Sequence, residues 1–324
     1  MAVKCSVREL EYTLPADWWL AAKPKGRGQC KKVTGRIELL TGDNLPILQR
    51  MRAGRFRLIY IDPPFNTGRR QVRKRLRTVR VRQGAEGGDR TGYQGHRYRS
   101  EVLGVQSYAD RFDDYLGFLA PRLQQAHRLL TGDGSLMVHL DYREVHYVKV
   151  LLDDIFGREC FLNEIIWAYD YGARSKRRWS AKHDNILWYV RDPERYVFDY
   201  EAMDRIPYMA PGLVGPEKAA RGKTPTDVWW HTIVSPGGRE RTGYPTQKPL
   251  GIMRRLLQVH TEVGDEVLDF FAGSGSFGEA AAELGRHPTL VDCSEQAIEV
   301  MRKRFEGYDV RDQVDGPIAP KADS

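Results

Sequence analysis

The sequence Asp62-Pro63-Pro64-Phe65 combines groups that would prepare an amino group for attack on an electrophile. The amino group of a nucleobase is a poor nucleophile because its lone pair is delocalised into the ring. A carboxylate at Asp62 and a backbone carbonyl at Pro63 would accept its two N–H bonds, and the prolines stiffen the loop without adding a competing donor. Phe65 offers a ring on which an everted base could stack. An isolated Asp-Pro-Pro sequence more often only ends a strand, because two prolines cannot continue a β-ladder.

A second motif, Phe271-Ala272-Gly273-Ser274-Gly275, lies between a predicted strand at 266–269 and a predicted helix at 277–284. Glycines in such a turn let the backbone approach a ligand closely. Asp292 ends the next predicted strand, where an acid would accept hydrogen bonds from ribose hydroxyls. Both features favour a cofactor that contains a nucleoside. A nicotinamide dinucleotide stays an alternative, because Gly278 would supply the third glycine of its fingerprint.

The remaining chain supplies the elements that must position these motifs. Predicted strands alternate with predicted helices, which is typical of an α/β fold with a doubly wound, mostly parallel sheet. Parallel strands end at one edge of a sheet, so aspartates at four strand ends predict a shared polar rim for a ligand. Each of them alone is more usually a helix N-cap or a turn residue. These strand-end aspartates are Asp43, Asp62, Asp269 and Asp292.

The charge balance favours a polyanionic partner. The chain has 324 residues, with 51 Lys and Arg against 43 acids and a formal net charge of +8. Basic residues gather in two runs that flank the candidate chemistry, and this arrangement favours nucleic acid. The residues predicted to contact DNA are Arg69, Arg70, Arg73, Lys74, Arg174, Lys176, Arg177 and Arg178.

Composition narrows the class of protein further. With 41% hydrophobic and 29% charged residues, the chain is typical of a soluble globular protein, and no apolar run approaches the ~20 residues of a membrane span. The four cysteines lie far apart, which argues against a zinc site or a disulfide scaffold and for a reducing compartment. We therefore expect a cytoplasmic, nucleoid-associated protein with no metal site. The histidines lack metal-ligand spacing, and His139, His146 and His183 are interpreted as structural.

Taken together, the motifs resemble those of the amino-methylating DNA methyltransferases that use S-adenosylmethionine. Asp62-Pro63-Pro64-Phe65 is similar to the catalytic motif of that family, and Phe271 to Gly275 to its cofactor loop. Thr246-Gln247-Lys248-Pro249 is similar to a further cofactor-side motif. With the catalytic motif first, the order resembles the circularly permuted β group over about residues 36–306. The resemblance implies a Rossmann-like methyltransferase fold and methylation of adenine N6 in double-stranded DNA.

The resemblance also implies a role for each site residue. Asp292 should bind the cofactor ribose, and Asp43 should sit near its adenine. Thr246 and Lys248 precede a helix whose N-terminus can hold the methionine carboxylate. The implied catalytic residues are Asp62, Pro63, Pro64 and Phe65. The implied cofactor residues are Asp43, Thr246, Lys248, Asp269, Phe271, Ala272, Gly273, Gly275 and Asp292.

The same comparison of motifs predicts the organisation of the chain. An N-terminal arm at 1–35 precedes a catalytic half at 36–169, which contains an Arg-rich insertion loop at 68–107. A target-recognition region at 170–240, a cofactor-binding half at 241–306 and a C-terminal tail at 307–324 follow.

Two alternatives for the activity stay open at this point. The first is N4-cytosine methylation, although Asp62 favours adenine because the cytosine enzymes usually carry Ser at that position. The second is a catalytically idle DNA-binding relative. The sequence also leaves open a homodimer and a cognate restriction endonuclease as further partners.

Overall fold

The computed structural model describes residues 35–66, 69–80, 90–91, 97–110, 112–172, 174–235 and 237–314, and for residues 69–110 it describes the backbone only. Apart from Gly35, the predicted N-terminal arm lies outside the described residues. No helix in the described part of the chain has the length and apolar character needed to cross a membrane.

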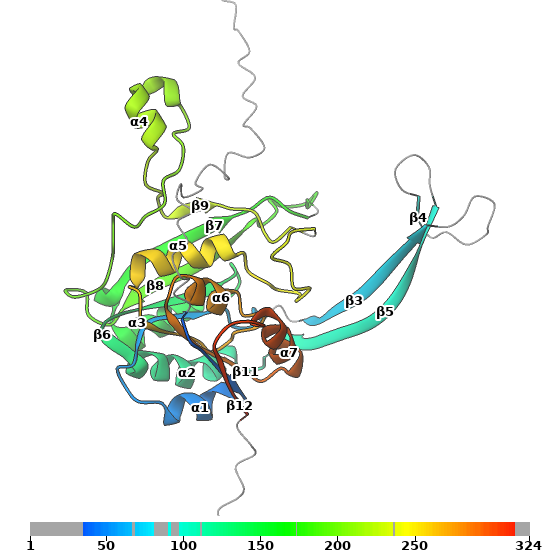
Figure 1. The fold of residues 1–324 in the computed structure, drawn as a ribbon, viewed down its shortest axis with the longest axis horizontal. Coiled ribbons are helices and arrows are strands. Elements are labelled where there is room, and N and C mark those ends of the chain that lie inside the picture. The colour runs from blue at the N-terminus through cyan, green and yellow to red at the C-terminus, as the bar shows by residue number, and fades with distance from the viewer. Residues whose placement is uncertain are drawn as a thin grey trace, which may run out of the picture.

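A nine-stranded sheet forms the centre of the molecule (Figure 1). Every neighbouring pair is parallel except those of β8, which runs antiparallel to both β6 and β7. The predicted α/β fold with a mostly parallel sheet is therefore confirmed. The strands lie in the order β12 (Val310–Val314), β1 (Ile37–Thr41), β11 (His287–Asp292), β10 (Glu266–Asp269), β2 (Phe56–Ile61), β6 (Leu130–Leu140), β8 (His183–Val190), β7 (Phe161–Ala168) and β9 (Val228–Trp230).

The order of strands in space confirms the predicted permutation. β1, the first strand of the chain, pairs with β11 near its end, and β2 pairs with β10. From β10 the sheet therefore grows in two directions, through β11 and β1 on one side and through β2 and β6 on the other. Doubly wound sheets bind ligands where the direction of growth reverses, at the carboxyl ends of the two central strands.

Helices cover both faces of the sheet (Figure 1). On one face α1, α2 and α3 pack in a row, and on the other α5 packs against α6. α7 follows β11 and begins with Ser294 as its N-cap, whose side chain accepts from Ala297 N. The helices are α1 (Asn44–Arg50), α2 (Tyr115–Leu129), α3 (Val145–Phe156), α4 (Pro216–Arg221), α5 (Leu250–His260), α6 (Ser276–Glu283) and α7 (Glu295–Arg304).

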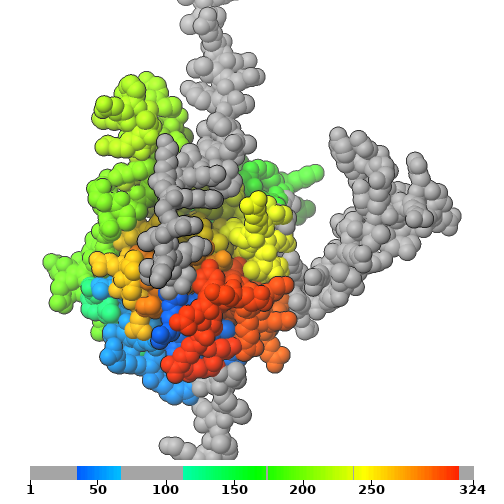
Figure 2. Space-filling model, viewed as in Figure 1, coloured from blue at the N-terminus to red at the C-terminus, as the bar shows by residue number. Residues whose placement is uncertain are grey.

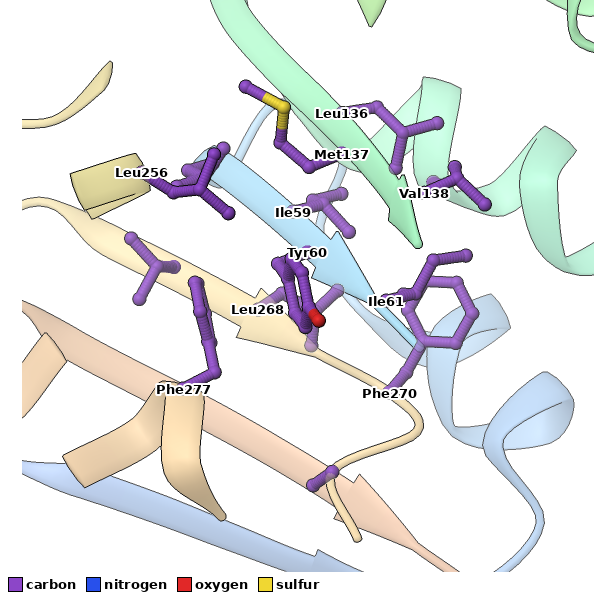
Figure 3. Packing of buried hydrophobic residues seen from close by; sticks show 14 of the residues in the cluster. Ile59, Tyr60, Ile61, Leu136, Met137, Val138, Leu256, Leu268, Phe270 and Phe277 are labelled. Carbon is purple, nitrogen blue, oxygen red and sulfur yellow. The ribbon is translucent and has the colours of Figure 1, made fainter. Parts of the chain in front are cut away.

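The central strand β2 is buried on both faces, as parallel strands covered by two helical layers are. Side chains alternate along a strand, so Ile59 and Ile61 face one layer while Tyr60 faces the other (Figure 3). The ring of Tyr60 stacks on Phe277 of α6, with 5.3 Å between ring centroids and 18° between planes. This packing fixes the direction in which the chain leaves β2 at Asp62.

Residues 68–107 are predicted as a loop, and here the structure differs. β3 (Arg69–Arg80) and β5 (Arg97–Asp110) pair in an antiparallel ribbon that projects from the body, with the short β4 (Arg90–Thr91) at its far end (Figure 1). Backbone ladder hydrogen bonds hold such a ribbon together. Hydrophobic periodicity does not signal it, because arginines interrupt the apolar and polar alternation that marks a half-buried strand.

The C-terminal tail also differs from its prediction. Residues 310–314 form β12, which adds an edge strand parallel to β1 with Ile37 opposite Val310. Its sequence Val-Arg-Asp-Gln-Val is too short and too polar to stand out as a strand. The pairing depends on a neighbour more than 250 residues away in the chain.

The predicted target-recognition region at 170–240 is largely irregular, but it contains α4, β9 and also β8, which belongs to the central sheet and pairs with β6 and β7. Residues 206–223 form a lobe that stands out from the body (Figure 2), closed at its base by a bridge between Ile206 and Lys223. Met209 and Leu213 in this lobe are 87% and 88% exposed. The lobe therefore contributes little to the core.

Candidate active site

The two sequence motifs meet in one cavity at the carboxyl ends of β10 and β2. It has a volume of about 710 Å³, and both the Asp62 loop and the Gly273 turn line it. Neighbouring register positions of the two strands, Leu268 and Ile59, explain why the loops that follow them are adjacent. The structure thus brings the predicted catalytic motif and the predicted cofactor loop together. The predicted site residues in this lining are Asp43, Asp62, Pro63, Pro64, Phe65, Thr246, Lys248, Asp269, Phe271, Ala272, Gly273 and Asp292.

Lys248 contacts both ends of the catalytic motif. Its Nζ pairs with Asp62 Oδ2, and the same atom lies 4.9 Å from the centroid of the Phe65 ring. The two charged side chains are largely buried, with 11% of Lys248 and 16% of Asp62 exposed. Asp62 Oδ1 is buried and has no hydrogen-bond partner among the described residues. One carboxylate oxygen is therefore held by the lysine, and the hydrogen-bonding capacity of the other is unused within the described structure.

Asn66 anchors the loop formed by Asp62 to Phe65, immediately after its last residue. No motif in the sequence marks Asn66 for this role. Its φ of 49° lies in the left-handed region, which Asn tolerates better than most residues. Its side chain donates to Glu144 Oε1 at 2.8 Å and accepts from Phe112 N at 3.0 Å. Because Phe112 follows β5, a single side chain holds the start and the end of the β3–β5 ribbon beside the motif.

Asp292 holds the glycine turn in place. Its Oδ2 accepts from Gly273 N at 2.8 Å, and its Oδ1 accepts from Ser294 N at the same distance. Gly273 has a φ of +50° and lies against Tyr244. Gly275, with a φ of +74°, contributes the shape of the turn rather than a lining surface. A Cβ there would lie 2.8 Å from Met301 Cγ and 2.9 Å from Phe305 Cζ.

The floor of the cavity carries buried carboxyl groups that are difficult to ionise. Asp269 is 3% exposed, and burial raises the pKa of its carboxyl well above the ordinary value. The Asp62 and Asp292 carboxylates raise the pKa of Asp269 further, against a hydrogen bond from Phe271 N and the charge of Lys248. Burial also raises the pKa of Asp292. Acids that are difficult to ionise become easier to ionise beside a cation. The cavity therefore suits a positively charged ligand.

The cavity wall near Asp43 includes the aromatic ring of Phe118 and is held in place by a buried arginine, Arg122. No motif in the sequence marks this arginine. Arg122 lies 3.9 Å from the Phe118 ring centroid, and its guanidinium donates to Asp43 Oδ1 at 3.0 Å and Asn44 Oδ1 at 2.6 Å. Asn44 in turn donates to the Phe270 carbonyl at 2.7 Å. Asp43 also caps α1. This wall offers stacking surface and polar edges, as a nucleoside requires.

The turn before α5 places Thr246 and Lys248 at the cavity. Gln247 between them points away from it, donating to the Glu240 carbonyl at 2.6 Å and accepting from Thr242 N at 2.8 Å. The Glu240 carboxylate accepts from Leu250 N, in the first turn of α5, at 3.1 Å. The expectation that this helix N-terminus holds a ligand carboxylate is therefore not met at Leu250, because a carboxylate of the protein takes that N–H.

Phe65 separates the first cavity from a second one of about 410 Å³. The second cavity lies between the end of β6 and the segment that joins β7 to β8. Its lining is mostly polar, and it consists of Phe65, Asp141, Tyr142, Arg143, Tyr169, Ser175, Arg178, Ser180, Ala181, His183 and Asp184. A ring bound there would lie next to Phe65, which also lines the cavity that contains Asp62.

The basic segment between β7 and β8 borders this second cavity. Arg178 lines the cavity, while the next residue, Trp179, is 99% exposed. Arg174 pairs with Asp170 at 2.9 Å, and Lys176 and Arg177 are exposed. The side chains of the other predicted DNA contacts, Arg69, Arg70, Arg73 and Lys74, lie outside the described residues.

Comparison with known proteins agrees with this geometry. A sequence profile described as DNA methylase matches residues 56–303. The chain is 29% identical to the type II methyltransferase M.HpaI of Haemophilus parainfluenzae, over 62% of this chain and 64% of that protein. It is 26% identical to the type II methyltransferase M.ScaI of Streptomyces caespitosus, over 90% and 88% of the two chains. It is 22% identical to the DNA adenine methyltransferase YhdJ of Escherichia coli strain K12, over 83% and 82%.

Solved structures share the fold. The M1.HpyAVI–SAM complex superposes with a TM-score of 0.52 at 20% identity, over 83% of this chain and 98% of that one. The PvuII DNA methyltransferase, described as cytosine-N4-specific, gives a TM-score of 0.56 at 14% identity, over 84% and 87%.

Proposed function

Because the chain belongs to the DNA methylase family, whose methyl donor is S-adenosylmethionine, we propose that it methylates adenine N6 in double-stranded DNA. The observation that carries this proposal is the shared cavity, which Asp62 and the Gly273 turn line together, while Asp62 Oδ1 has no hydrogen-bond partner among the described residues. When bound, S-adenosylmethionine supplies an electrophilic methyl group on a positively charged sulfur.

The residues of the larger cavity suit that donor. Asp269 and Asp292 place negative charge beside a cation, and Phe271 adds the face of an aromatic ring. Asp43 and Asn44 lie at the wall where a nucleoside would stack. Apart from Asn44, these positions are the ones that the sequence resemblance implies, and Arg122 holds Asp43 and Asn44 in place.

The Asp62 loop would orient the amino group. Lys248 occupies Oδ2 of Asp62, so Oδ1 is the acceptor left for one N–H of the amine. Pro63 is buried and Pro64 follows it, so the loop is stiff before the base arrives. Phe65 would stack on the everted base on the side of the second cavity. Preorganised acceptors of this kind lower the barrier without rearrangement during the reaction.

Adenine is favoured over cytosine by Asp62 and by the name of the E. coli relative, a DNA adenine methyltransferase. We further propose a place for the enzyme on the nucleoid, where it would protect sites from a cognate restriction endonuclease. The type II names of M.HpaI and M.ScaI support that pairing. A homodimer stays a prediction, which light scattering of the purified protein tests.

The decisive experiment measures which nucleoside is methylated. DNA free of modified bases is incubated with the protein and labelled S-adenosylmethionine, digested to nucleosides and separated by chromatography. We expect the label in N6-methyladenine. Label in N4-methylcytosine would replace the proposed base, and cofactor binding without any incorporation would favour the idle DNA-binding relative.

The matched variant Asp62→Asn tests the role of the loop. It keeps the shape of the side chain and can still accept from Lys248, but it replaces one acceptor oxygen with a donor. We expect a loss of about 10²- to 10³-fold in kcat, typical of losing one preorganised group, with unchanged cofactor affinity by calorimetry. Asp133→Asn is the control, because Asp133 pairs with Arg57 near the amino ends of β2 and β6, away from the cavity at the carboxyl ends. Turnover of Asp62→Asn near the control rate would refute the role.

A further inference from the structure

Four polar side chains form a hydrogen-bonded chain inside the molecule, from β2 through β6 and β8 to the residue after β7. Tyr60 Oη lies 2.8 Å from His139 Nδ1, and His139 Nε2 lies 3.2 Å from Asp184 Oδ2. Tyr169 Oη donates to the other oxygen, Asp184 Oδ1, at 3.1 Å. His139 is fully buried, and Tyr60 and Asp184 are 2% and 7% exposed. The steps of methyl transfer described above use none of these hydrogen bonds.

The surroundings assign a proton to each hydrogen bond. Burial, together with the nearby Asp62 and Asp269 carboxylates, raises the pKa of Tyr60, so its hydroxyl keeps its proton and donates to His139 Nδ1. Burial opposes the charge on Asp184, but the hydrogen bond from His139, the charge of Lys248 and the hydrogen bond from Tyr169 lower its pKa overall. Asp184 is thus an acceptor only, and His139 carries its proton on Nε2. Each member of the chain has one orientation.

The chain runs from one cavity to the other. Tyr60 lines the larger cavity, and its ring is stacked on Phe277 (Figure 3). At the other end, Tyr169 and Asp184 line the second cavity. The hydrogen bonds therefore cross the wall that the two cavities share.

The histidine in the middle lies beside Phe65, the residue that forms part of that wall. The ring centroids of His139 and Phe65 are 6.0 Å apart at 31°. Trp167 meets the same imidazole edge-on at 5.5 Å, and its Nε1 is itself held by the His231 carbonyl at 2.7 Å. Phe65 thus packs against a ring whose two nitrogens and one edge are fixed by other elements.

Stability alone does not explain a buried polar chain of this kind. Desolvating an ionised carboxylate is expensive, and well-packed apolar side chains of similar volume often stabilise a core as well or better. What such a network adds is one defined geometry. Resting on the function proposed above, we propose that the Tyr60–His139–Asp184–Tyr169 chain is a positioning device, which holds Phe65 so that the target base stacks in one orientation beside Asp62.

Two variants test this inference. Asp184→Asn removes the charge that fixes the His139 tautomer, and we expect kcat to fall about 10- to 100-fold, as small misplacements of a reacting group do. Tyr169→Phe removes only one hydrogen bond, and we expect a loss of about two- to tenfold. Cofactor affinity by calorimetry should stay at the wild-type value in both, because the larger cavity keeps all its lining groups.

Tyr189→Phe is the matched control. Like the Tyr169 hydroxyl, the Tyr189 hydroxyl donates to an aspartate, Asp153, at 2.6 Å. Tyr189 lies on β8, as Asp184 does, but neither Tyr189 nor Asp153 lines either cavity. We expect Tyr189→Phe to lower the melting temperature at least as much as Tyr169→Phe and to leave kcat unchanged. The control thereby separates loss of a buried hydrogen bond from loss of positioning.

A spectroscopic readout reports the stacking directly. 2-Aminopurine is placed at the methylated position of a DNA duplex, once sequencing of methylated DNA has mapped that position. The fluorescence of an everted 2-aminopurine is quenched when it stacks on Phe65. Asp184→Asn should therefore give a more fluorescent complex than the wild type, and Phe65→Ala, which removes the stacking ring, should change the fluorescence in the same direction.

The outcomes separate this inference from the proposed function. If the wild type methylates DNA while Asp184→Asn and Tyr169→Phe match its kcat and its fluorescence, the positioning role is wrong. It is equally wrong if kcat, cofactor affinity and melting temperature fall together, because that pattern indicates a structural role only. If the wild type does not methylate DNA, it is the proposed function that fails.

Discussion

The larger cavity is lined by strand ends and short turns that the regular sheet positions, whereas the second cavity takes five of its eleven lining residues from the irregular segment between β7 and β8. Their electrostatics differ as well. Burial raises the pKa of Asp269 in the larger cavity, while His139 and its neighbours lower the pKa of Asp184 in the second despite burial. The first cavity is therefore suited to receive a cation, and the second has its charge compensated within the protein.

The variant Asp269→Asn tests this contrast with the largest expected effect. Asn keeps an acceptor for Phe271 N but removes the charge, and we expect cofactor affinity to fall about 10²- to 10³-fold or more, since losing one partner of a buried charge pair costs about 3–5 kcal/mol. The free protein should not lose stability, because its fold disfavours the ionised form of Asp269. Calorimetry and thermal unfolding measure the two quantities.

Asp184→Asn should show the reverse pattern in the same two measurements. Its carboxylate is stabilised by the fold, so its removal lowers the melting temperature and leaves cofactor affinity unchanged. If both variants destabilise the free protein equally, the two cavities do not differ in the way described.

The pH dependence provides a second test. A raised pKa in the folded protein means that Asp269 favours folding at low pH and loses that contribution as the pH rises through its folded pKa. A bound cation favours the carboxylate, so cofactor binding should release a proton and tighten as the pH increases above the ordinary aspartate value of 3.8. Calorimetry in two buffers of different ionisation enthalpy counts that proton, and Asp269→Asn should abolish the release.

Asp184 should act in the opposite pH range. Because its folded pKa is lowered, its stabilising contribution is present at neutral pH and is lost as the pH falls through the folded pKa, below 3.8. Acid unfolding of Asp184→Asn should therefore be less steep than that of the wild type.

Trp179, next to Arg178 of the second cavity, tests whether this side of the molecule binds DNA while the larger cavity binds the cofactor. We propose that Trp179, whose side chain is 99% exposed next to Arg178, stacks on bases of the DNA. We expect Trp179→Ala to weaken DNA binding by about 1–3 kcal/mol, the range for one base–aromatic stack, without changing cofactor affinity. Tyr147→Ala is a control, because Tyr147 is 63% exposed on α3. Equal loss in both variants would contradict a specific contact.

Arg177 should have the smallest effect. A single phosphate contact contributes modestly, so we expect Arg177→Ala to reduce the slope of log affinity against log salt by about one unit. Arg195→Ala is the matched control, since Arg195 is an exposed arginine that pairs with Asp192 at 2.7 Å. Fluorescence anisotropy over a salt series measures both slopes, and an unchanged slope for Arg177→Ala would remove it from the interface.

The predicted site residues that the structure brings together at the larger cavity carry short-range signals. Asp62 and Asp292 end buried strands, and Gly273 lies in a turn between a strand and a helix. Once the sheet is parallel, these positions must share one edge. The strand–helix alternation is enough to predict that sheet.

The groups that escaped prediction depend on distant partners. Arg122 meets Asp43 across 79 residues, and His139 meets Asp184 across 45. No spacing in the chain reveals such pairs, because strand register and order decide them. β12 is absent from the predicted elements for the same reason, and the β3–β5 ribbon because its arginines mask the strand periodicity.

The clamp at Asn66 has a consequence for how such enzymes diversify. Because one amide side chain holds the chain on both sides of the β3–β5 ribbon, the segment between can lengthen, shorten or be exchanged while the catalytic loop keeps its place. The ribbon is therefore an insertion whose two ends are held at a fixed position by Asn66. Exchange of the ribbon, in evolution or by design, can therefore change how far the protein extends from its body without changing the position of the Asp62 loop.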